Sequence, residues 1–271
     1  MGRVTRRHAV VKIGPDSTRR LDDLLAVEEP LEVRLDGTAF SVTMRTPGHD
    51  IDLVHGLLHG EQIIHAASDV VLARYCAGEG PDGLNTYNVL DVTLAASVAR
   101  PDPGLQRNVL TTSACGICGA TSIEAVTREA RYELPLLRLP AAALGRGQAQ
   151  LRAQQRVFAQ TGGLHAAGLM AASGEVFCVR EDVGRHNAVD KVIGWALREN
   201  RLPLSAASLC VSGRASFELT QKAVLAGIPV LAAVSAPSSL AVELAEQAGL
   251  TLVGFVRGDT MNVYTHPERI C

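Results

Sequence analysis

The 271-residue sequence has few aromatic residues, few cysteines, little net charge and no long apolar run. No apolar run approaches the roughly 20 residues that a membrane-spanning helix needs, and the basic N-terminus lacks the apolar stretch of a secretory signal. We therefore expect a cytoplasmic protein with no membrane partner. A formal net charge of −2 argues against a broad nucleic-acid-binding surface, so no nucleic-acid partner is expected.

Six cysteines are too few for a disulfide scaffold in a chain of this length, and a reducing compartment would leave them as thiols. Only Cys115 and Cys118 lie close together. Cys178 and Cys210 fall inside apolar runs that predict strands, which indicates buried and inert side chains. The close pair is therefore the first candidate for chemistry.

Apolar residues make up 47% of the chain, enough for a sizeable core. In the first part, alternating residues predict a hairpin over 31–44 and a strand over 87–94, and Asp50 is positioned to cap a helix. The Pro- and Gly-rich segment 100–104 is the best candidate for a domain junction. We expect a smaller N-terminal α+β domain over 1–104 and an α/β domain over 105–271.

The second half alternates short apolar runs with helical patterns. The expected strands are 176–179, 208–211, 229–234 and 250–256, and the expected helices are 187–199, 215–226 and 238–248. This order predicts an α/β fold with a largely parallel sheet that is covered by helices on both faces.

A short polar segment follows each of these strands: 180–187, 212–216, 235–239 and 257–262. Ligands bind beyond the carboxyl ends of strands in such sheets, and free N–H groups at a helix start favour phosphate. Four arginines could add phosphate contacts: Arg180, Arg185, Arg214 and Arg257. The segments together favour an anionic ligand, such as a nucleotide or a pterin phosphate.

The Cys115-Gly-Ile-Cys118 pair precedes a helical pattern over 121–130, and a helix N-terminus stabilises a thiolate. A closed zinc site needs four ligands, so zinc would have to recruit His165, His186 or a distant cysteine. Zinc binding, a redox pair and sulfur transfer all fit this spacing. His165 follows two glycines at an expected helix start, where it could be a base, a ligand or a packed side chain.

Seven stretches resemble the formate dehydrogenase accessory sulfurtransferase family, the FdhD/NarQ type. They occur in order over most of the chain, and REDVGRHNAVDK beside SGRASFE is the most distinctive part. The matching stretches are 45–64, 113–119, 161–168, 180–194, 212–223, 235–245 and 253–270.

The resemblance implies a sulfurtransferase that accepts persulfide sulfur from a cysteine desulfurase. It would deliver this sulfur to the molybdenum bis(molybdopterin guanine dinucleotide) cofactor of formate dehydrogenase. By motif, Cys115 would carry the persulfide and Cys118 would assist transfer or resolution. Cofactor binding would involve Phe255, Val256, Arg257, Gly258, Asp259 and Thr260. The resemblance also implies a homodimer and a three-layer fold similar to that of cytidine deaminases, with no tightly bound metal ion.

Two alternatives come from other classes. A zinc-dependent deaminase-like hydrolase would need a Glu two residues after its histidine, but Ala167 stands there after His165. The cysteine pair also precedes the histidine, which reverses the deaminase order. A non-catalytic chaperone that only holds the molybdenum cofactor would keep the phosphate-binding segments but need no reactive thiol.

Overall fold

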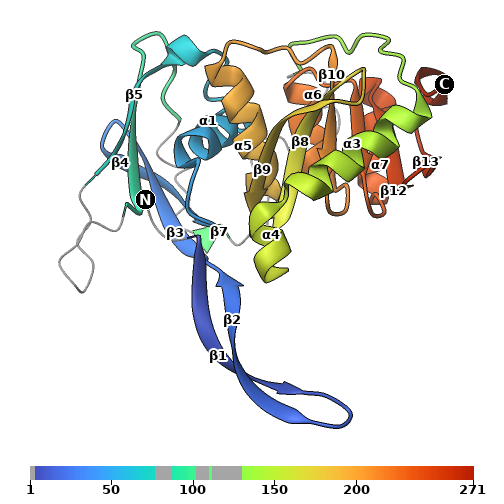
Figure 1. Cartoon of the computed structure of the whole chain (residues 1–271). Coiled ribbons are helices and arrows are strands. Elements are labelled where there is room, and N and C mark those ends of the chain that lie inside the picture. Colours follow the sequence, from blue (N-terminus) through green and yellow to red (C-terminus); the bar gives the residue numbers. More distant parts are fainter. Residues whose placement is uncertain (1–3, 77–86, 102–109, 112–129) are drawn as a thin grey trace.

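The computed structural model describes residues 4–76, 87–101, 110–111 and 130–271. It contains a two-stranded hairpin, a five-stranded sheet and a six-stranded sheet, with helices packed around and between the two larger sheets (Figure 1). This mixed architecture confirms the predicted α/β class. No helix within the described ranges is long and apolar enough to cross a membrane.

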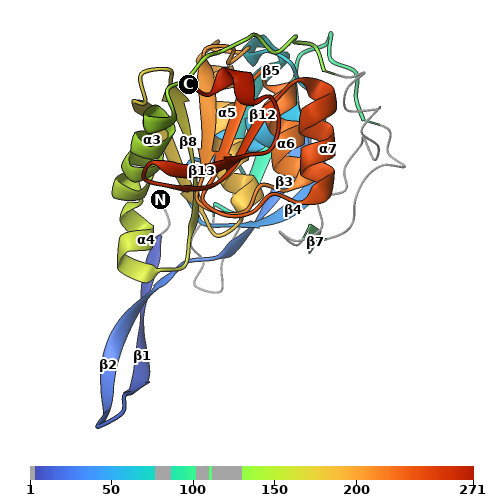
Figure 2. The same cartoon turned by 90° about the vertical axis from the view of Figure 1, so that its right-hand side faces the viewer.

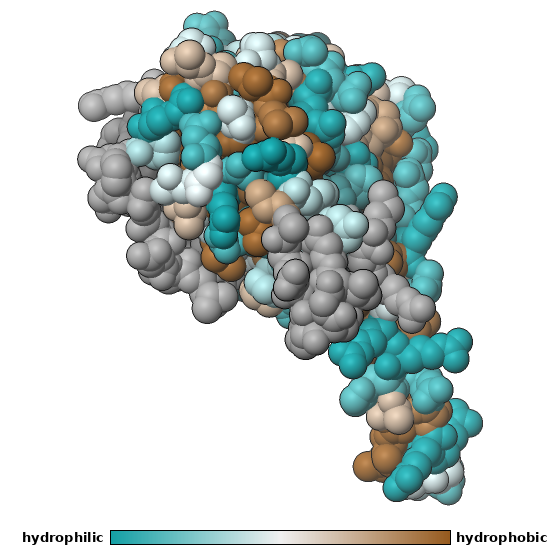
Figure 3. All heavy atoms as spheres, turned by 90° about the vertical axis from the view of Figure 1, so that its left-hand side faces the viewer, coloured by the Kyte–Doolittle hydropathy of each residue, from teal (hydrophilic) through white to brown (hydrophobic). Residues whose placement is uncertain are grey.

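The N-terminal hairpin extends away from the rest of the molecule (Figure 1). Its strands β1 (Thr5–Ile13) and β2 (Thr18–Ala26) are antiparallel. Only the base of the hairpin reaches the body of the protein, and Val11 and Ile13 on β1 are exposed (Figure 1). Figure 3 shows hydrophobic atoms among hydrophilic ones on the projecting hairpin.

The first large sheet has the order β5-β6-β3-β4-β7. Its strands are β3 (Glu29–Leu35), β4 (Thr38–Arg45), β5 (Val70–Tyr75), β6 (Val89–Leu94) and β7 (Leu110–Thr111). The predicted hairpin over 31–44 is confirmed, because Asp36 and Gly37 both adopt positive φ in the turn between β3 and β4. The predicted strand over 87–94 is confirmed as β6, and the short 3₁₀ helix Ala67–Asp69 precedes β5.

Helix α1 (Asp50–Gly60) joins this sheet to the second one by packing against α5 (Arg185–Arg198). Asp50 is the first helical residue rather than the cap, since His49 holds the cap position and the Asp50 carboxylate binds Arg45. The two helices approach closely because a Cβ on Gly56 would overlap the backbone of Asp190, and one on Gly194 would overlap that of Asp52.

The second large sheet has the order β13-β12-β11-β10-β8-β9. Its strands are β8 (His165–Ala171), β9 (Val176–Asp182), β10 (Ala207–Val211), β11 (Val230–Ala233), β12 (Thr251–Arg257) and β13 (Thr260–Val263). Only β10, β11 and β12 pair in parallel, so the expectation of a largely parallel sheet is wrong. β8 and β13 pair antiparallel with their neighbours, and their sequences gave no clear strand pattern. β8 precedes β9 in the chain, and β13 follows β12 through a short turn.

Helices cover both faces of this sheet, which gives three layers (Figure 2). On one face lie α3 (Ala141–Gln154) and α4 (Arg156–Thr161). On the other lie α5, α6 (Phe217–Leu225) and α7 (Ser239–Ala248), and the 3₁₀ helix Pro267–Arg269 is near the C-terminus. The two faces have separate buried clusters, one with α5 to α7 and one with α3. The cytidine deaminase-like fold name and the domain division at residue 104 stay predictions.

A buried ion pair connects the two large sheets. The Lys191 ammonium on α5 lies 2.7 Å from the Asp182 carboxylate at the end of β9, and the two side chains are 1% and 0% exposed. Lys191 also donates to the carbonyl oxygen of Thr46, and Asp182 accepts from the Thr46 N–H. The segment after β4 is therefore held against the end of β9.

Candidate functional site

The carboxyl ends of four strands meet at one edge of the second sheet. β9 runs antiparallel to β8, and β8 runs antiparallel to β10, so β9 points the same way as β10, β11 and β12. The predicted segments 180–187, 212–216, 235–239 and 257–262 lie at these strand ends. Residues 180–182 still belong to β9, residue 257 ends β12, and 260–262 belong to β13. The predicted convergence of these segments is confirmed. It arises because β8 lies antiparallel between β9 and β10, and not because all strands of the sheet are parallel.

Backbone hydrogen bonds hold neighbouring segments of this edge together. The N–H of Ser235 donates to the carbonyl oxygen of Gly213, and the N–H of Ser238 donates to that of Ala215. The N–H of Phe255 donates in turn to the carbonyl oxygen of Ser235. The loops after β10, β11 and β12 therefore form one continuous rim.

Three helices begin at this rim, namely α5, α6 and α7. The Ser238 hydroxyl accepts from the N–H of Ala241 and caps α7, whereas no described side chain caps α5 or α6. Unpaired N–H groups and the positive end of the helix dipole attract anions. The rim therefore has the polarity that a phosphate-bearing ligand needs.

Of the four arginines proposed from the sequence, Arg257 is the last residue of β12, and the other three divide into two groups. Arg185 and Arg214 lie close enough to His165 for their charges to act on its ring. Arg180 instead donates to Asp52, 3.0 Å away, and is 15% exposed, and its proposed phosphate contact stays a prediction. Burial would raise the pKa of Asp52, but hydrogen bonds from His49, Arg198 and Arg180 lower it to about 2.

His165 is the first residue of β8 and not the start of a helix, so that expectation is wrong. The preceding Gly162, with φ of 67°, ends α4, and β8 then pairs on both sides with β9 and β10. Burial lowers the pKa of His165, and the positive charges of Arg185, His186 and Arg214 lower it further. The lowered pKa favours the neutral form of this ring, which stands at the rim.

A second histidine lies at the start of α5. His186 Nε2 is 2.5 Å from a carboxylate oxygen of Glu218 on α6, and the two side chains are 12% and 20% exposed. Burial would raise the pKa of Glu218, but the hydrogen bond and the charge of His186 lower it, and Lys222 and Arg185 lower it further. This pair joins the two distinctive motifs that carry the resemblance.

The predicted cofactor-binding residues form the end of β12, the following turn and the start of β13. Phe255 has a φ of 53° and is 38% exposed, while Val256 is buried. The turn between Arg257 and Thr260 contains Gly258, whose φ is 56°. The segment belongs to the rim, and its cofactor-binding role stays a prediction.

The predicted catalytic residues Cys115 and Cys118 lie outside the described residues, as does nearly all of the helix expected over 121–130. Cys178 and Cys210 are buried in strands as predicted, and burial raises the pKa of these thiols to about 11 and about 12. Both are poor nucleophiles at neutral pH. Among the described residues, no group of three or more His, Cys, Asp or Glu side chains could hold a metal ion.

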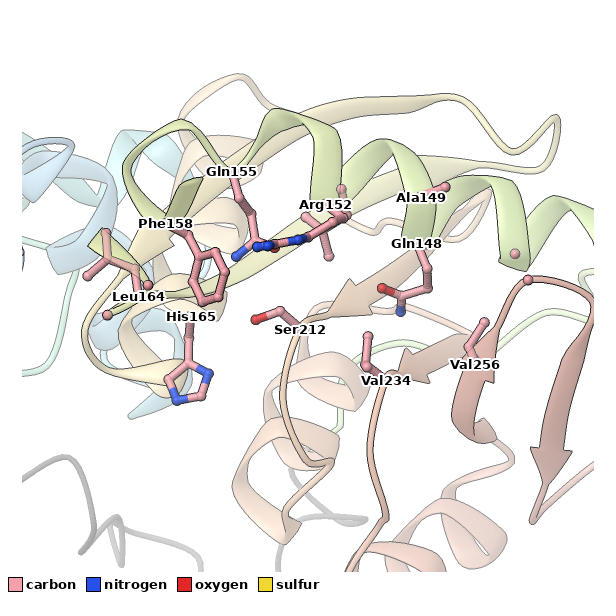
Figure 4. A pocket seen from close by; sticks show the side chains of 15 residues that line it. Gln148, Ala149, Arg152, Gln155, Phe158, Leu164, His165, Ser212, Val234 and Val256 are labelled. Carbon is pink, nitrogen blue, oxygen red and sulfur yellow. The ribbon is translucent and has the colours of Figure 1, made fainter. Parts of the chain in front are cut away.

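A cavity of about 590 Å³ lies beside the rim, between the α3–α4 segment and the ends of β8, β10, β11 and β12. Gln148, Arg152, Gln155 and Phe158 reach into it from one side, opposite His165, Ser212, Val234 and Val256 (Figure 4). Sequence reasoning missed this cavity, because the α3 residues match no motif and only helical spacing could have grouped them.

Comparisons with known proteins agree with the motifs. Residues 26–271 match the FdhD/NarQ family. The sulfur carrier protein FdhD of Nocardia farcinica is 62% identical over 271 residues, which cover 99% of this chain and 96% of the relative. That of Mycolicibacterium paratuberculosis is 58% identical over 269 residues, which cover 98% of this chain and 99% of the relative.

A solved structure has the same fold. A crystal structure from Desulfotalea psychrophila, described as a formate dehydrogenase accessory protein, superimposes with a TM-score of 0.77 at 24% identity. The match covers 99% of this chain and 100% of the other. The sequence relatives and the family match together establish that the chain belongs to the FdhD/NarQ family.

Proposed function

We propose that this chain is a sulfurtransferase that takes up persulfide sulfur on Cys115 from a cysteine desulfurase. It then delivers this sulfur to the molybdenum bis(molybdopterin guanine dinucleotide) cofactor of formate dehydrogenase. The names of the relatives as sulfur carrier proteins support the carrier role. The desulfurase, formate dehydrogenase, a second copy of the chain as dimer partner and a cytoplasmic location are parts of the proposal.

The observation that carries the cofactor part of the proposal is the rim. It gathers the starts of α5, α6 and α7, together with Arg185 and Arg214, beside the segment 255–260. A dinucleotide carries pyrophosphate, and these groups are the donors that pyrophosphate needs. An anionic cofactor held there would be the acceptor of the sulfur.

The uptake step is an exchange at sulfur. The Cys115 thiolate attacks the outer sulfur of the donor persulfide, and the sulfur–sulfur bond of the donor breaks. The donor cysteine leaves with the electron pair as a thiolate, and Cys115 becomes the persulfide. Cys118 is close in sequence and would assist release of the sulfur.

Intact-protein mass after incubation with a cysteine desulfurase and cysteine tests this proposal. Wild type and Cys118→Ala should each gain one sulfur atom that a reductant removes, and Cys115→Ala should gain none. Cys271→Ala is the matched control, because Cys271 is exposed and lies at the far end of the chain. Uptake by Cys115→Ala equal to that of wild type would refute the carrier assignment, and a chaperone without thiol chemistry would show no uptake in any variant.

A further inference from the structure

A β-bulge lies at the open edge of the second sheet. β9 is the edge strand of this sheet, and it packs beside α5 (Figure 1). Val176 and Cys178 pair with adjacent residues of β8, so Phe177 between them has no partner on that strand. Bulges at sheet edges re-aim side chains, and the large apolar ring of Phe177 is 37% exposed here.

Two further side chains complete a surface cluster with Phe177. Trp195 on α5, the only tryptophan of the chain, lies with its ring centroid 6.1 Å from that of Phe177. The guanidinium carbon of Arg201 lies over both rings, 5.0 Å from the centroid of Trp195 and 5.7 Å from that of Phe177. We call these three residues the edge cluster. Aromatic residues and arginine are enriched at protein–protein interfaces and contribute much of their binding energy, so this composition is typical of a docking surface.

The edge cluster contains an arginine without a counter-ion. Two neighbouring arginines, Arg180 and Arg198, share the buried carboxylate of Asp52. Arg201 is exposed and forms no ion pair within the part of the chain that the structure describes. Because its guanidinium rests on the aromatic rings, its planar set of N–H donors stays available for an incoming carboxylate. The charge of this surface is therefore complementary to an acidic segment.

The edge cluster lies away from the rim. Phe177 is the second residue of β9, whose carboxyl end is at the rim. Trp195 stands in the last turn of α5, whose first residue, Arg185, is at the rim. A rise of about 1.5 Å per residue separates these two positions on α5 by about 15 Å. A protein bound at the edge cluster would therefore leave the rim open for the cofactor.

A second copy of the chain fits this surface poorly. If two copies met through their edge clusters, Arg198 and Arg201 would face the same arginines, and like charges across an interface oppose binding.

We propose that the edge cluster docks an acidic segment of the protein that donates the persulfide sulfur. Arg201 would bind a carboxylate of that segment through two parallel N–H donors, and the rings of Phe177 and Trp195 would be covered by its apolar side chains. This inference deepens the proposed function, on which it rests for the identity of the partner as the sulfur donor.

The rate of sulfur uptake at Cys115, measured against the concentration of cysteine desulfurase, tests this assignment. Arg201→Gln removes the charge and the planar donors but keeps part of the apolar stem. We expect it to raise the desulfurase concentration for half-maximal uptake by about tenfold, with the maximal rate unchanged. Binding to immobilised desulfurase should weaken by the same factor. Glu199→Gln, which removes an exposed carboxylate two residues before Arg201, should strengthen this binding.

Arg146→Gln is the matched control. Arg146 is an exposed arginine on α3, which covers the other face of the second sheet, and it donates to the carbonyl oxygen of Ser173. This variant should leave the affinity for the desulfurase unchanged. Phe177→Ala provides a second test, since loss of its exposed ring should weaken docking without any change of charge. Melting temperatures within about 2 °C of that of wild type would show that these variants fold.

The outcomes separate this inference from the proposed function. If Cys115 takes up sulfur but Arg201→Gln and Phe177→Ala bind the desulfurase as tightly as wild type, the docking assignment alone is wrong. If binding of the desulfurase depends on Arg201 but Cys115 takes up no sulfur, the carrier proposal fails and the docking assignment stands.

Two other results would also overturn the docking assignment. A lower maximal rate of Arg201→Gln at saturating desulfurase would mean that Arg201 acts on the transfer step and not on docking. A wild-type dimer that Arg201→Gln converts to a monomer in sedimentation, with unchanged affinity for the desulfurase, would assign the edge cluster to a second copy of the chain.

Discussion

Replacement of Lys191 by Met should destabilise the protein strongly. Lys191 and Asp182 are almost completely buried, with 2.7 Å between the ammonium nitrogen and a carboxylate oxygen. Methionine keeps the length and apolar stem of the side chain but leaves the Asp182 charge without its counter-ion. Removal of one partner of a buried pair costs about 3–5 kcal/mol, since the remaining charge is neither solvated nor paired.

Asp182 retains some hydrogen bonds in this variant, from the N–H groups of Thr46 and Gly184 and from the side chain of Asn187. These three donors favour the lower part of that range, about 3 kcal/mol. In a domain of 150–250 residues each kcal/mol lowers the melting temperature by about 2–4 °C, so we expect a loss of about 6–12 °C.

Thermal unfolding followed by circular dichroism measures this loss, with Lys12→Met on the exposed hairpin as the control. The control should change stability by less than about 0.5 kcal/mol. The double variant Asp182→Asn with Lys191→Met should regain much of the loss, because no buried charge remains. A melting temperature for Lys191→Met within about 2 °C of that of wild type corresponds to a loss of about 1 kcal/mol at most. This result would refute the assignment of the pair as a charged structural link.

Two further predictions concern α1. Gly194→Ala should lower the free energy of unfolding by about 1–3 kcal/mol, as measured by urea titration. The reason is that the added Cβ overlaps the backbone of Asp52 and separates α1 from α5. An increase in stability, as expected from the higher helix propensity of alanine alone, would contradict this packing. Burial lowers the pKa of His59 to about 4, whereas an unfolded imidazole titrates near 6.5. Between these two pKa values the unfolded state binds a proton that the folded state does not bind. The free energy of unfolding should therefore fall as the pH drops below 6.5, and it should be lower by about 2 kcal/mol at pH 5. Urea titrations of wild type and His59→Leu across this pH range measure the effect. If the free energy of unfolding depends on pH in the same way in both proteins, His59 is not the source of the loss.

The sequence predicts those elements whose local pattern and tertiary environment agree. β9 to β12 and the helices between them follow from apolar runs and helical spacing, and glycine at 249 ends α7 as expected. β8 fails this test because HAAGLMA is rich in small residues with little strand propensity. Its small side chains instead fit a crowded sheet interior, where a Cβ on Gly168 would lie 3.0 Å from Leu151.

The candidate site is predictable only in part for a related reason. Strand ends and helix starts are local features, so the rim can be derived once the strands are known. The cavity depends on the distance between α3 and the sheet, which Gly145 and Gly147 set by removing side chains that would collide with Gly258 and Met170. No pattern within α3 itself reveals that approach.

The ion pair and the rim together explain why a motif far from the proposed chemistry belongs to the resemblance. The segment 45–50 contributes Thr46, whose backbone binds both Lys191 and Asp182. Asp182 then accepts from the N–H of Gly184, the residue before α5, and from the side chain of Asn187 in its first turn. The start of α5 is thus fixed from the first sheet, and with it the position of Arg185 and His186 at the rim. A change in this segment would therefore act on ligand binding by moving the helix start, without any direct contact with the ligand.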